Sequence, residues 1–259
     1  MTVEPTALDT IRRESRESEG VLEANDLCKS FRSHRIVEQV SLHVAPGEIV
    51  GLLGPNGAGK TTTFSMIVGL LQPDAGKIRL AGRDITLLPL HRRALEGIAY
   101  LPQESSVFRG LTVRANIELV LEAQGTEELE IAEICGRLLD EFGLSDIADR
   151  SAYLLSGGER RRCEIARAMA IRPKHVLLDE PFAGIDPIAV AEIQRIVRRM
   201  AMNGIGVLVT DHNVRETLQI TDRAYIISQG RIFRRGSPIA LASDDEVRAI
   251  YLGDDFRLE

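Results

Sequence analysis

The stretch EIVGLLGPNGAGKT, residues 48 to 61, decides the fold class because it joins a short apolar strand to a glycine-rich loop and then to a helix. Its second half fits the pattern GxxxxGK(S/T), in which glycines let backbone N–H groups turn inward around phosphate oxygens. The lysine of such a loop reaches the outer phosphates, and the hydroxyl that follows it binds Mg²⁺. The sequence therefore predicts a site for ATP and Mg²⁺ built from Gly54, Pro55, Asn56, Gly57, Ala58, Gly59, Lys60, Thr61 and Thr62.

A second buried strand, in HVLLDEP at residues 175 to 181, ends in two carboxylates. Asp179 is expected to emerge at the carboxyl edge of a parallel sheet, where ligands of such folds bind, and to hold the Mg²⁺ there. Glu180 follows directly and is predicted to orient and deprotonate the water that attacks the γ-phosphate. The alternative for Glu180 is an ordinary solvated acid at the end of a strand.

Two further side chains are candidates for the same edge of the sheet. Gln103 follows a strand and a proline in IAYLPQ, so its amide is predicted to contact both Mg²⁺ and water. His212 is expected to end the strand VLVTDH, at the edge from which an imidazole reaches a γ-phosphate. Taken alone, Gln103 is equally well a plain turn residue, and an isolated histidine at the end of a strand is usually structural.

A second anion-binding shape lies about a hundred residues after the first, in LSGGERRR at residues 155 to 162. Ser156 and Glu159 have the S-x-x-E spacing of a capping box, and Gly157 and Gly158 leave backbone N–H groups at the positive end of a helix. An ordinary capped helix is the alternative. Arg160 to Arg162 are expected to point in different directions, toward solvent or toward a partner, rather than toward nucleic acid.

Composition places the chain among folded, soluble proteins. It has 259 residues, of which 44% are hydrophobic and 27% charged, and a net charge of −6, which argues against general nucleic-acid binding. Apolar runs such as residues 49 to 53 are far shorter than the roughly 20 residues that span a bilayer, so we expect a cytosolic chain. The three cysteines lack CxxC spacing and are expected to be buried thiols, with neither a disulfide framework nor a zinc site.

The chain divides into three parts. Residues 1 to 20 interleave acids with arginines and are expected to form a flexible extension. Residues 21 to 240 alternate strand and helix patterns, which predicts a mostly parallel sheet covered on both faces. An amphipathic helical insertion at about residues 104 to 160 interrupts this alternation, with apolar side chains at helical spacing from Ile131 to Phe142. Residues 241 to 259 are expected to form a helix and a tail of unknown role.

With GPNGAGKT, LPQ, LSGGE, LLDEP, GID and TDH in this order, residues 21 to 240 resemble the ATP-binding cassette (ABC) ATPases. The resemblance implies an α/β fold, with a P-loop NTPase (RecA-like) core, a mostly parallel sheet, an antiparallel β subdomain and an inserted α-helical subdomain. It also implies a head-to-tail homodimer, in which the second phosphate grip serves the partner's ATP. The residues that would act in this way are Leu155, Ser156, Gly157, Gly158, Glu159 and Asp186.

The same resemblance assigns three individual roles. Asp186 would cross between subunits, His212 would contact the γ-phosphate, and Phe31 in CKSF would stack on adenine. An aromatic residue in the position of Phe31 is otherwise more often part of a core. Two small departures from the family pattern remove no catalytic group: the signature has Glu159 where glutamine is commoner, and FAGID replaces a turn that usually contains serine.

Further stretches, among them LLPLHRRA, SGGERRR, TDHNVRETL and the ending YLGDDFRL, resemble the lipopolysaccharide-export ATPases of Gram-negative bacteria from about residue 21 to 258. This implies a homodimer beneath two transmembrane permease subunits, peripheral at the cytoplasmic face of the inner membrane. Phe108 and Arg109 are predicted to lie in a groove that receives a helix of a permease. Phe108 packing under its own loop is the alternative.

Other functions remain open at this stage. The ATPase of a branched-chain amino-acid importer shares the glycine-rich motifs, the AGID-like turn and a YLG tail. Cassette ATPases that act on DNA or ribosomes need a long coiled-coil insertion or a second cassette, which 259 residues do not accommodate. A non-enzymatic regulatory subunit would lack the catalytic base, whereas Glu180 is present.

Overall fold

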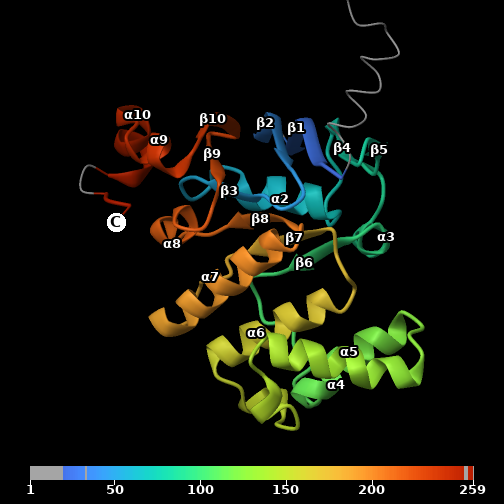
Figure 1. Cartoon of the computed structure of the whole chain (residues 1–259). Helices are drawn as coiled ribbons and strands as arrows, with labels where there is room; N and C mark the ends of the chain where they lie inside the picture. Colours follow the sequence, from blue (N-terminus) through green and yellow to red (C-terminus); the bar gives the residue numbers. More distant parts are fainter. Residues whose placement is uncertain (1–19, 33, 254–255, 259) are drawn as a thin grey trace, which may run out of the picture.

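The structure, a computed structural model, describes residues 20–32, 34–253 and 256–258. In this part of the chain two β-sheets lie together, with a group of helices on one side of them (Figure 1). The expected N-terminal extension therefore lies outside the described residues except for Gly20. Residues 254, 255 and 259 of the expected C-terminal tail lie outside them as well.

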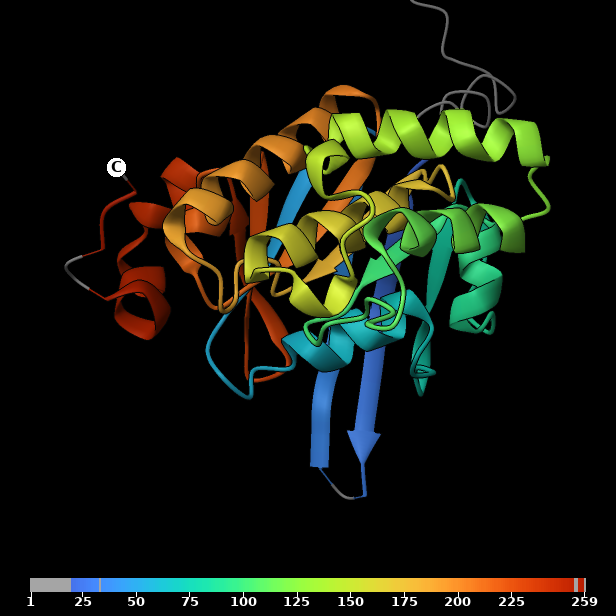
Figure 2. The same ribbon diagram turned by 90° about the horizontal axis from the view of Figure 1, so that it is seen from below.

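The smaller sheet is antiparallel, with strand order β2-β1-β4-β5. Its strands are β1 Leu22–Phe31, β2 His34–Val44, β4 Ala75–Leu80 and β5 Arg83–Asp84. The β1–β2 hairpin projects from the body of the molecule, as the blue ribbon at the bottom of Figure 2 shows. This sheet confirms the antiparallel β subdomain that the sequence resemblance implied.

The larger sheet has the order β10-β9-β3-β8-β7-β6. All its pairings are parallel except that of the edge strand β10 with β9. Its strands are β3 Ile49–Leu53, β6 Ile98–Leu101, β7 His175–Asp179, β8 Gly206–Thr210, β9 Arg223–Ser228 and β10 Arg231–Gly236. The mostly parallel sheet predicted from sequence is confirmed.

Helices cover the larger sheet and form a separate lobe below it (Figures 1 and 2). The α-helices are α2 Lys60–Val68, α3 Leu90–Leu95, α4 Val113–Ala123, α5 Glu128–Glu141, α6 Gly157–Met169, α7 Pro187–Met202, α8 Val214–Leu218, α9 Pro238–Ala242 and α10 Asp245–Val247. Two short 3₁₀ segments, η1 Ser145–Ile147 and η2 Ala152–Leu154, and a π-helical turn, η3 Arg248–Leu252, complete them.

Three boundaries differ from the sequence expectation for local reasons. The sequence pattern after the glycine-rich loop predicts a helix from Lys60 to Leu70. Helix α2 ends at Val68 instead, because Gly69 takes a left-handed conformation with φ of 87° and closes the helix. Strand β8 ends at Thr210, so His212 lies in the following turn and not on the strand. The C-terminal helix is a short α10 continued by a π-turn, Arg248–Leu252.

The strands of the larger sheet are buried on both faces. In β7, Val176 and Leu178 pack with the helices of the lower lobe, whereas Leu177 packs with α2 and the antiparallel sheet. This alternation explains the continuous apolar run of the strand. Cys135 and Cys163 are buried as expected, but Cys28 is partly exposed.

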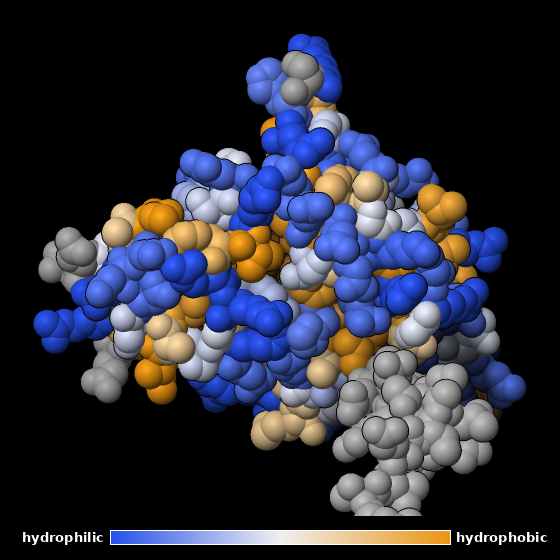
Figure 3. Space-filling view, turned by 90° about the horizontal axis from the view of Figure 1, so that it is seen from above, coloured by the Kyte–Doolittle hydropathy of each residue, from blue (hydrophilic) through white to orange (hydrophobic). Residues whose placement is uncertain are grey.

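The face seen from above is mainly polar. Figure 3 shows hydrophilic residues over most of it, with apolar side chains gathered in separate spots. Among the described residues, none of the helices has the length and apolar character needed to cross a membrane.

A buried histidine connects the two sheets. Nε2 of His175, at the start of β7, lies 3.1 Å from the carbonyl oxygen of Val44 at the end of β2. Because a carbonyl only accepts, Nε2 carries the proton, and the buried Nδ1 has no hydrogen-bond partner. Burial lowers the pKa of His175 to about 4.

This pKa shift predicts a pH-dependent stability. Between pH 6.5 and about 4 the unfolded chain binds a proton at His175 that the folded chain excludes. The contribution is therefore fully present above pH 6.5, and it is lost as the pH falls toward 4. His175→Gln, with an amide in place of the Nε2 donor, should flatten this part of the pH dependence of the unfolding free energy, measured by chemical denaturation. His91→Gln, at an exposed histidine, should keep the wild-type slope, and equal slopes for the two variants would contradict the assignment.

Candidate nucleotide site

The glycine-rich loop joins β3 to α2, as predicted, and its glycines are required by close backbone approaches. Gly54 has a φ of 154°, and a Cβ there would lie 2.1 Å from the carbonyl oxygen of Ile227. Gly59 has a φ of 101°, and a Cβ there would lie 2.8 Å from the carbonyl oxygen of Ile36. The loop is therefore held against β9 and β2 by its own backbone, which fixes the start of α2.

Lys60 is folded back over this loop. Its ammonium donates hydrogen bonds to the carbonyl oxygens of Gly54, at 2.6 Å, and Pro55, at 3.0 Å. Burial lowers the pKa of Lys60, and the charge of Glu180 acts in the opposite direction. The lysine is thus a half-buried cation at the positive end of α2, which is the arrangement that binds phosphate.

Asp179 lies at the end of β7, almost fully buried. The hydroxyl of Tyr100 donates to its Oδ2 over 3.4 Å. Burial raises the pKa of Asp179, and the neighbouring Glu180 raises it further. A carboxylate in this setting gains from a cation, because a metal ion offsets the cost of burying its charge.

The donors available for a cation are those of a nucleotide-bound metal. In the part of the chain that the structure describes, no three Asp, Glu, His or Cys side chains form a protein-only metal cage. One carboxylate, Asp179, and the hydroxyl of Thr61 on the first turn of α2 are the donor types that Mg²⁺ combines with phosphate oxygens and water. The residues therefore fit a Mg²⁺ ion that arrives with the nucleotide.

Three predicted catalytic residues meet at one carboxylate oxygen. The amide Nε2 of Gln103 donates to Oε2 of Glu180 over 2.7 Å. Nδ1 of His212 lies 3.2 Å from the same oxygen, and since a carboxylate only accepts, Nδ1 carries the proton in this contact. The segments that follow β6, β7 and β8 therefore converge on Glu180, at the edge of the sheet that the sequence indicated for all three residues.

The second phosphate grip has the predicted cap. Ser156 precedes α6 and its hydroxyl accepts the N–H of Glu159 at 3.3 Å, while Oε2 of Glu159 accepts the N–H of Ser156 at 2.8 Å. The capping box is confirmed. Leu155 differs in character from the others, because its side chain is buried within its own subunit and its carbonyl accepts from Arg160.

The starts of α6 and α7 touch. A Cβ on Gly158 would lie 2.6 Å from Cβ of Ala189 in α7, so glycine is needed there for packing as well as for an open backbone. Asp186 caps α7, accepting the N–H groups of Ile188 and Ala189 at 3.0 Å each. Ser156 and Asp186 thus begin two helices that are in direct contact.

The two phosphate grips lie in different parts of the subunit. In Figure 1, α2 lies between the two sheets, whereas α6 lies in the lower part of the molecule, beyond β6 and β7. Gln103, Gly157 and Glu180 line one cavity of about 180 Å³ on the α6 side. The two grips therefore begin different helices, α2 and α6, and Gly157 of the second lies on the same cavity as Gln103 and Glu180.

Arg161 corrects an expectation from sequence. It does not point to solvent or to a partner but is 6% exposed, inside its own subunit. Its guanidinium donates to the carbonyl oxygens of Pro102 and Asp179 and to the carboxylate of Glu164. Glu164 in turn accepts the N–H of Ser106 at 2.7 Å. A buried ion pair thus ties α6 to the loop of Gln103 and to the end of β7.

The residues assigned to adenine and to partner coupling are exposed. Phe31 ends β1 and is 48% exposed, with Nζ of Lys29 5.9 Å from its ring centre. Phe108 is also 48% exposed, and the guanidinium of Arg167 lies 5.1 Å from its ring centre. Arg109 is exposed beside it. Phe108 is therefore not simply packed under its own loop.

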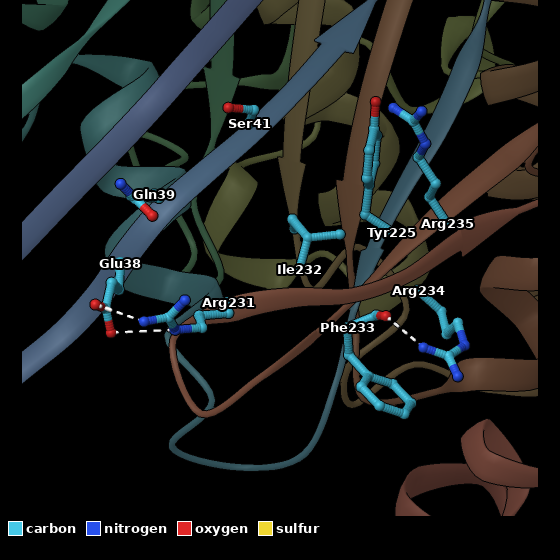
Figure 4. A pocket seen from close by; sticks show the side chains of 9 residues that line it. All are labelled: Glu38, Gln39, Ser41, Tyr225, Arg231, Ile232, Phe233, Arg234 and Arg235. Atoms are coloured by element: carbon cyan, nitrogen blue, oxygen red, sulfur yellow. Dashed lines mark hydrogen bonds and ion pairs between the residues drawn. The ribbon is translucent and has the colours of Figure 1, made fainter.

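A larger hollow lies elsewhere. A groove of about 550 Å³ runs between β2 and the edge strand β10 (Figure 4). Arg231 of β10 forms a salt bridge with Glu38 of β2 across the groove. Arg234 stacks over Phe233, with 4.5 Å between the guanidinium and the ring centre. None of the predicted site residues lines this groove, so we assign it no part in the chemistry although it is larger.

Comparison with known proteins agrees with this geometry. The family model for ABC transporters matches residues 37–183. A lipopolysaccharide export system ATP-binding protein, LptB, of Haemophilus influenzae is 53% identical over 239 residues, which cover 92% of this chain and 99% of the relative. The LptB of Escherichia coli K12 is 54% identical over 238 residues, with the same coverage. A probable ABC transporter ATP-binding protein of Azorhizobium caulinodans is 55% identical and covers 93% of this chain and 86% of its own.

Solved structures show the same fold. A nucleotide-free ATP-binding cassette from an ABC transporter superposes with a TM-score of 0.80 at 28% identity, covering 91% of this chain and all of that one. An ATP-binding cassette in its ADP conformation gives a TM-score of 0.81 at 29% identity, covering 91% of this chain and 99% of the other.

The convergence on Glu180 generates a prediction. Glu180→Gln should bind ATP as tightly as the wild type but hydrolyse it about 10²- to 10⁴-fold more slowly, because an amide cannot take the proton of water. Nucleotide binding and phosphate release measure the two effects separately. Glu130→Gln, on the exposed face of α5, should have wild-type turnover, and near-normal turnover of Glu180→Gln would reject the role of the base.

Proposed function

Because this chain belongs to the ABC transporter family and is an ATP-hydrolysing subunit of that family, we propose that it is the ATPase of a lipopolysaccharide exporter. The observation that carries the proposal is the likeness to relatives named for lipopolysaccharide export, which extends over nearly the whole chain. Their names do not favour the branched-chain amino-acid importer that the sequence left open. Lipopolysaccharide extraction from the inner membrane is the work that we assign to its ATP hydrolysis.

In the proposed reaction, Glu180 accepts a proton from the attacking water, while Gln103 and His212 fix the position of the Glu180 carboxylate. The contact of both residues with Oε2 supports this, because a base held from two sides stays aimed in one direction. His212 is also assigned to the outer phosphate, to which Nε2 would donate a hydrogen bond when both ring nitrogens carry a proton. Lys60 and the first-turn N–H groups of α2 neutralise the charge on the phosphate oxygens.

We assign the Mg²⁺ to Asp179, Thr61 and Gln103. When bound, the ion supplies charge neutralisation and orientation of the phosphates. The raised pKa of the buried Asp179 carboxyl supports this role, because burial destabilises the charged carboxylate and a bound cation would offset this cost. Phe31 is assigned to the adenine ring, since its exposed face at the end of β1 is open to stacking.

We also propose that two copies pair head to tail. The separation of α2 from α6 within one subunit supports this, because Ser156, Gly157, Gly158 and Glu159 then need a partner's ATP to serve any phosphate. Asp186 lies beside them, since α6 and α7 begin in contact. Leu155 contributes through its backbone, as its side chain is buried.

Mixed dimers test this pairing. A copy with Lys60→Ala and a copy with Ser156→Ala are each defective in both sites of their own homodimer. In the mixed dimer one site combines both defects, and the other combines an intact loop with an intact grip. ATP turnover of the purified mixed dimer should therefore rise clearly above that of either mutant homodimer. A mixed dimer as inactive as its parents, or a fully active monomer, would contradict head-to-tail pairing.

The proposed membrane partners are two transmembrane permease subunits, which would hold this chain at the cytoplasmic face of the inner membrane. We assign Phe108 and Arg109 to their docking, because an exposed aromatic beside an arginine is a common anchor in protein interfaces. Arg167 over the ring of Phe108 connects this place to α6. Movement of α6 would thus be felt at the partner.

Co-purification tests both the partners and the cargo. The full-length chain isolated from membranes should bring with it two permeases with large periplasmic domains, and ATP should drive lipopolysaccharide release from vesicles that contain the complex. Phe108→Ala should weaken the association while ATP binding stays unchanged. Leu129→Ala, at an exposed leucine of α5, should change neither the association nor ATP binding. Permeases accompanied by a solute-binding protein would point to import instead.

A further inference from the structure

A fully buried carboxylate lies directly behind the catalytic residues. Asp211 follows β8 and precedes His212, and its exposed fraction is 0%. Its Oδ2 accepts the N–H of Phe182 at 2.9 Å, and its Oδ1 accepts the N–H of Asn213 at 2.8 Å. Oδ1 also lies 3.4 Å from Nδ1 of His212. The Asp211 side chain therefore binds the backbone of two segments, the turn after β7 and the turn after β8.

The backbone that Asp211 holds is the turn that carries Glu180. Glu180 has a φ of 45°, in the left-handed region that residues other than glycine rarely adopt. Its N–H donates to the carbonyl oxygen of Thr210 at 2.7 Å, so the turn is bound at Glu180 by the end of β8 and at Phe182 by Asp211. Such strained backbone persists only where its surroundings fix it.

Other contacts of the turn point the same way. The amide of Asn213 donates to the carbonyl oxygen of Phe182 at 3.4 Å, so both backbone groups of Phe182 are bound by the segment after β8. Burial raises the pKa of Asp211, and the N–H groups of Asn213 and Phe182 counteract this by stabilising the charged form. The hydrogen bonds from these two backbone amides thus stabilise the buried carboxylate in its charged form.

We propose that Asp211 is a positioning residue for ATP hydrolysis, whose carboxylate clamps residues 180 to 182 and so holds Glu180 where Gln103 and His212 meet it. The proposal rests on the assignment of Glu180 as the base. It is independent of the cargo. Asp211 does not touch the nucleotide in this scheme, and it acts only through the turn and through the neighbouring imidazole.

Two substitutions grade the clamp. Asp211→Ala removes both acceptors, and kcat should fall about 10²-fold, the cost of a misplaced catalytic group. Asp211→Asn keeps one acceptor oxygen for two N–H groups, so its kcat should lie between those of the alanine variant and the wild type. The ATP dissociation constant should stay within about twofold of wild type for both, because the glycine-rich loop is bound by β9 and β2 instead.

Hydrogen exchange of the full-length chain gives a local readout. In Asp211→Ala, peptides covering residues 180 to 186 and 211 to 214 should exchange faster, because the N–H groups of Phe182 and Asn213 lose their acceptor. Exchange in β3 and α2 should be unchanged. Faster exchange throughout the chain, together with weaker ATP binding, would mean that Asp211 only stabilises the fold and would overturn the proposal.

Asp244 provides a matched control. Like Asp211, it accepts hydrogen bonds from two backbone N–H groups, here those of Glu246 and Val247, at 3.0 Å each. Both go to one oxygen, and they lie at the start of α10, away from the site. Asp244→Ala should therefore keep wild-type kcat. If Asp211→Ala keeps wild-type kcat while Glu180→Gln is inactive, the clamp is wrong. If Glu180→Gln is itself active, the assignment of the base fails, and the clamp fails with it.

Discussion

The pairing of β7 with β8 is the constraint on which the site depends. Its register places Asp179 opposite Thr210, so the two residues after each strand emerge side by side at the same edge of the sheet. The hydrogen bond from the N–H of Glu180 to Thr210 extends this pairing by one residue into the turn. Asp179 and Glu180 are therefore neighbours of His212, which lies about thirty residues later in the sequence, because of this strand pairing.

The sequence predicted the features that depend on short-range chemistry. The glycine-rich loop, the capping box of Ser156 and Glu159 and the alternation of helices and strands all follow from residues within a few positions of each other. The common edge of Gln103, Glu180 and His212 was also predicted, because parallel strands bring their carboxyl ends together, but the contacts of Gln103 and His212 with Glu180 itself were not. The N-terminal extension and the division into subdomains at about residue 104 stay predictions.

The residues that sequence missed act over long range. Arg161 reads as one of three arginines that point toward solvent or a partner, and only the tertiary contacts of α6 bury it beside Glu164 and the carbonyl of Asp179. Asp211 reads as part of a histidine motif, because nothing near it in sequence shows that its partner is the N–H of Phe182. His175 is a similar case, since its acceptor lies on the other sheet. Buried polar groups are placed by tertiary contacts, which local patterns do not contain.

The absence of a side chain at Gly158 has a mechanical consequence. With Ala189 against its backbone, the first turns of α6 and α7 have no room to slide past each other. Ser156 and Asp186 are therefore held at a fixed spacing by the packed starts of the two helices, and not on two loops that move separately. A molecule that binds this surface would therefore meet the serine and the aspartate as one preformed arrangement.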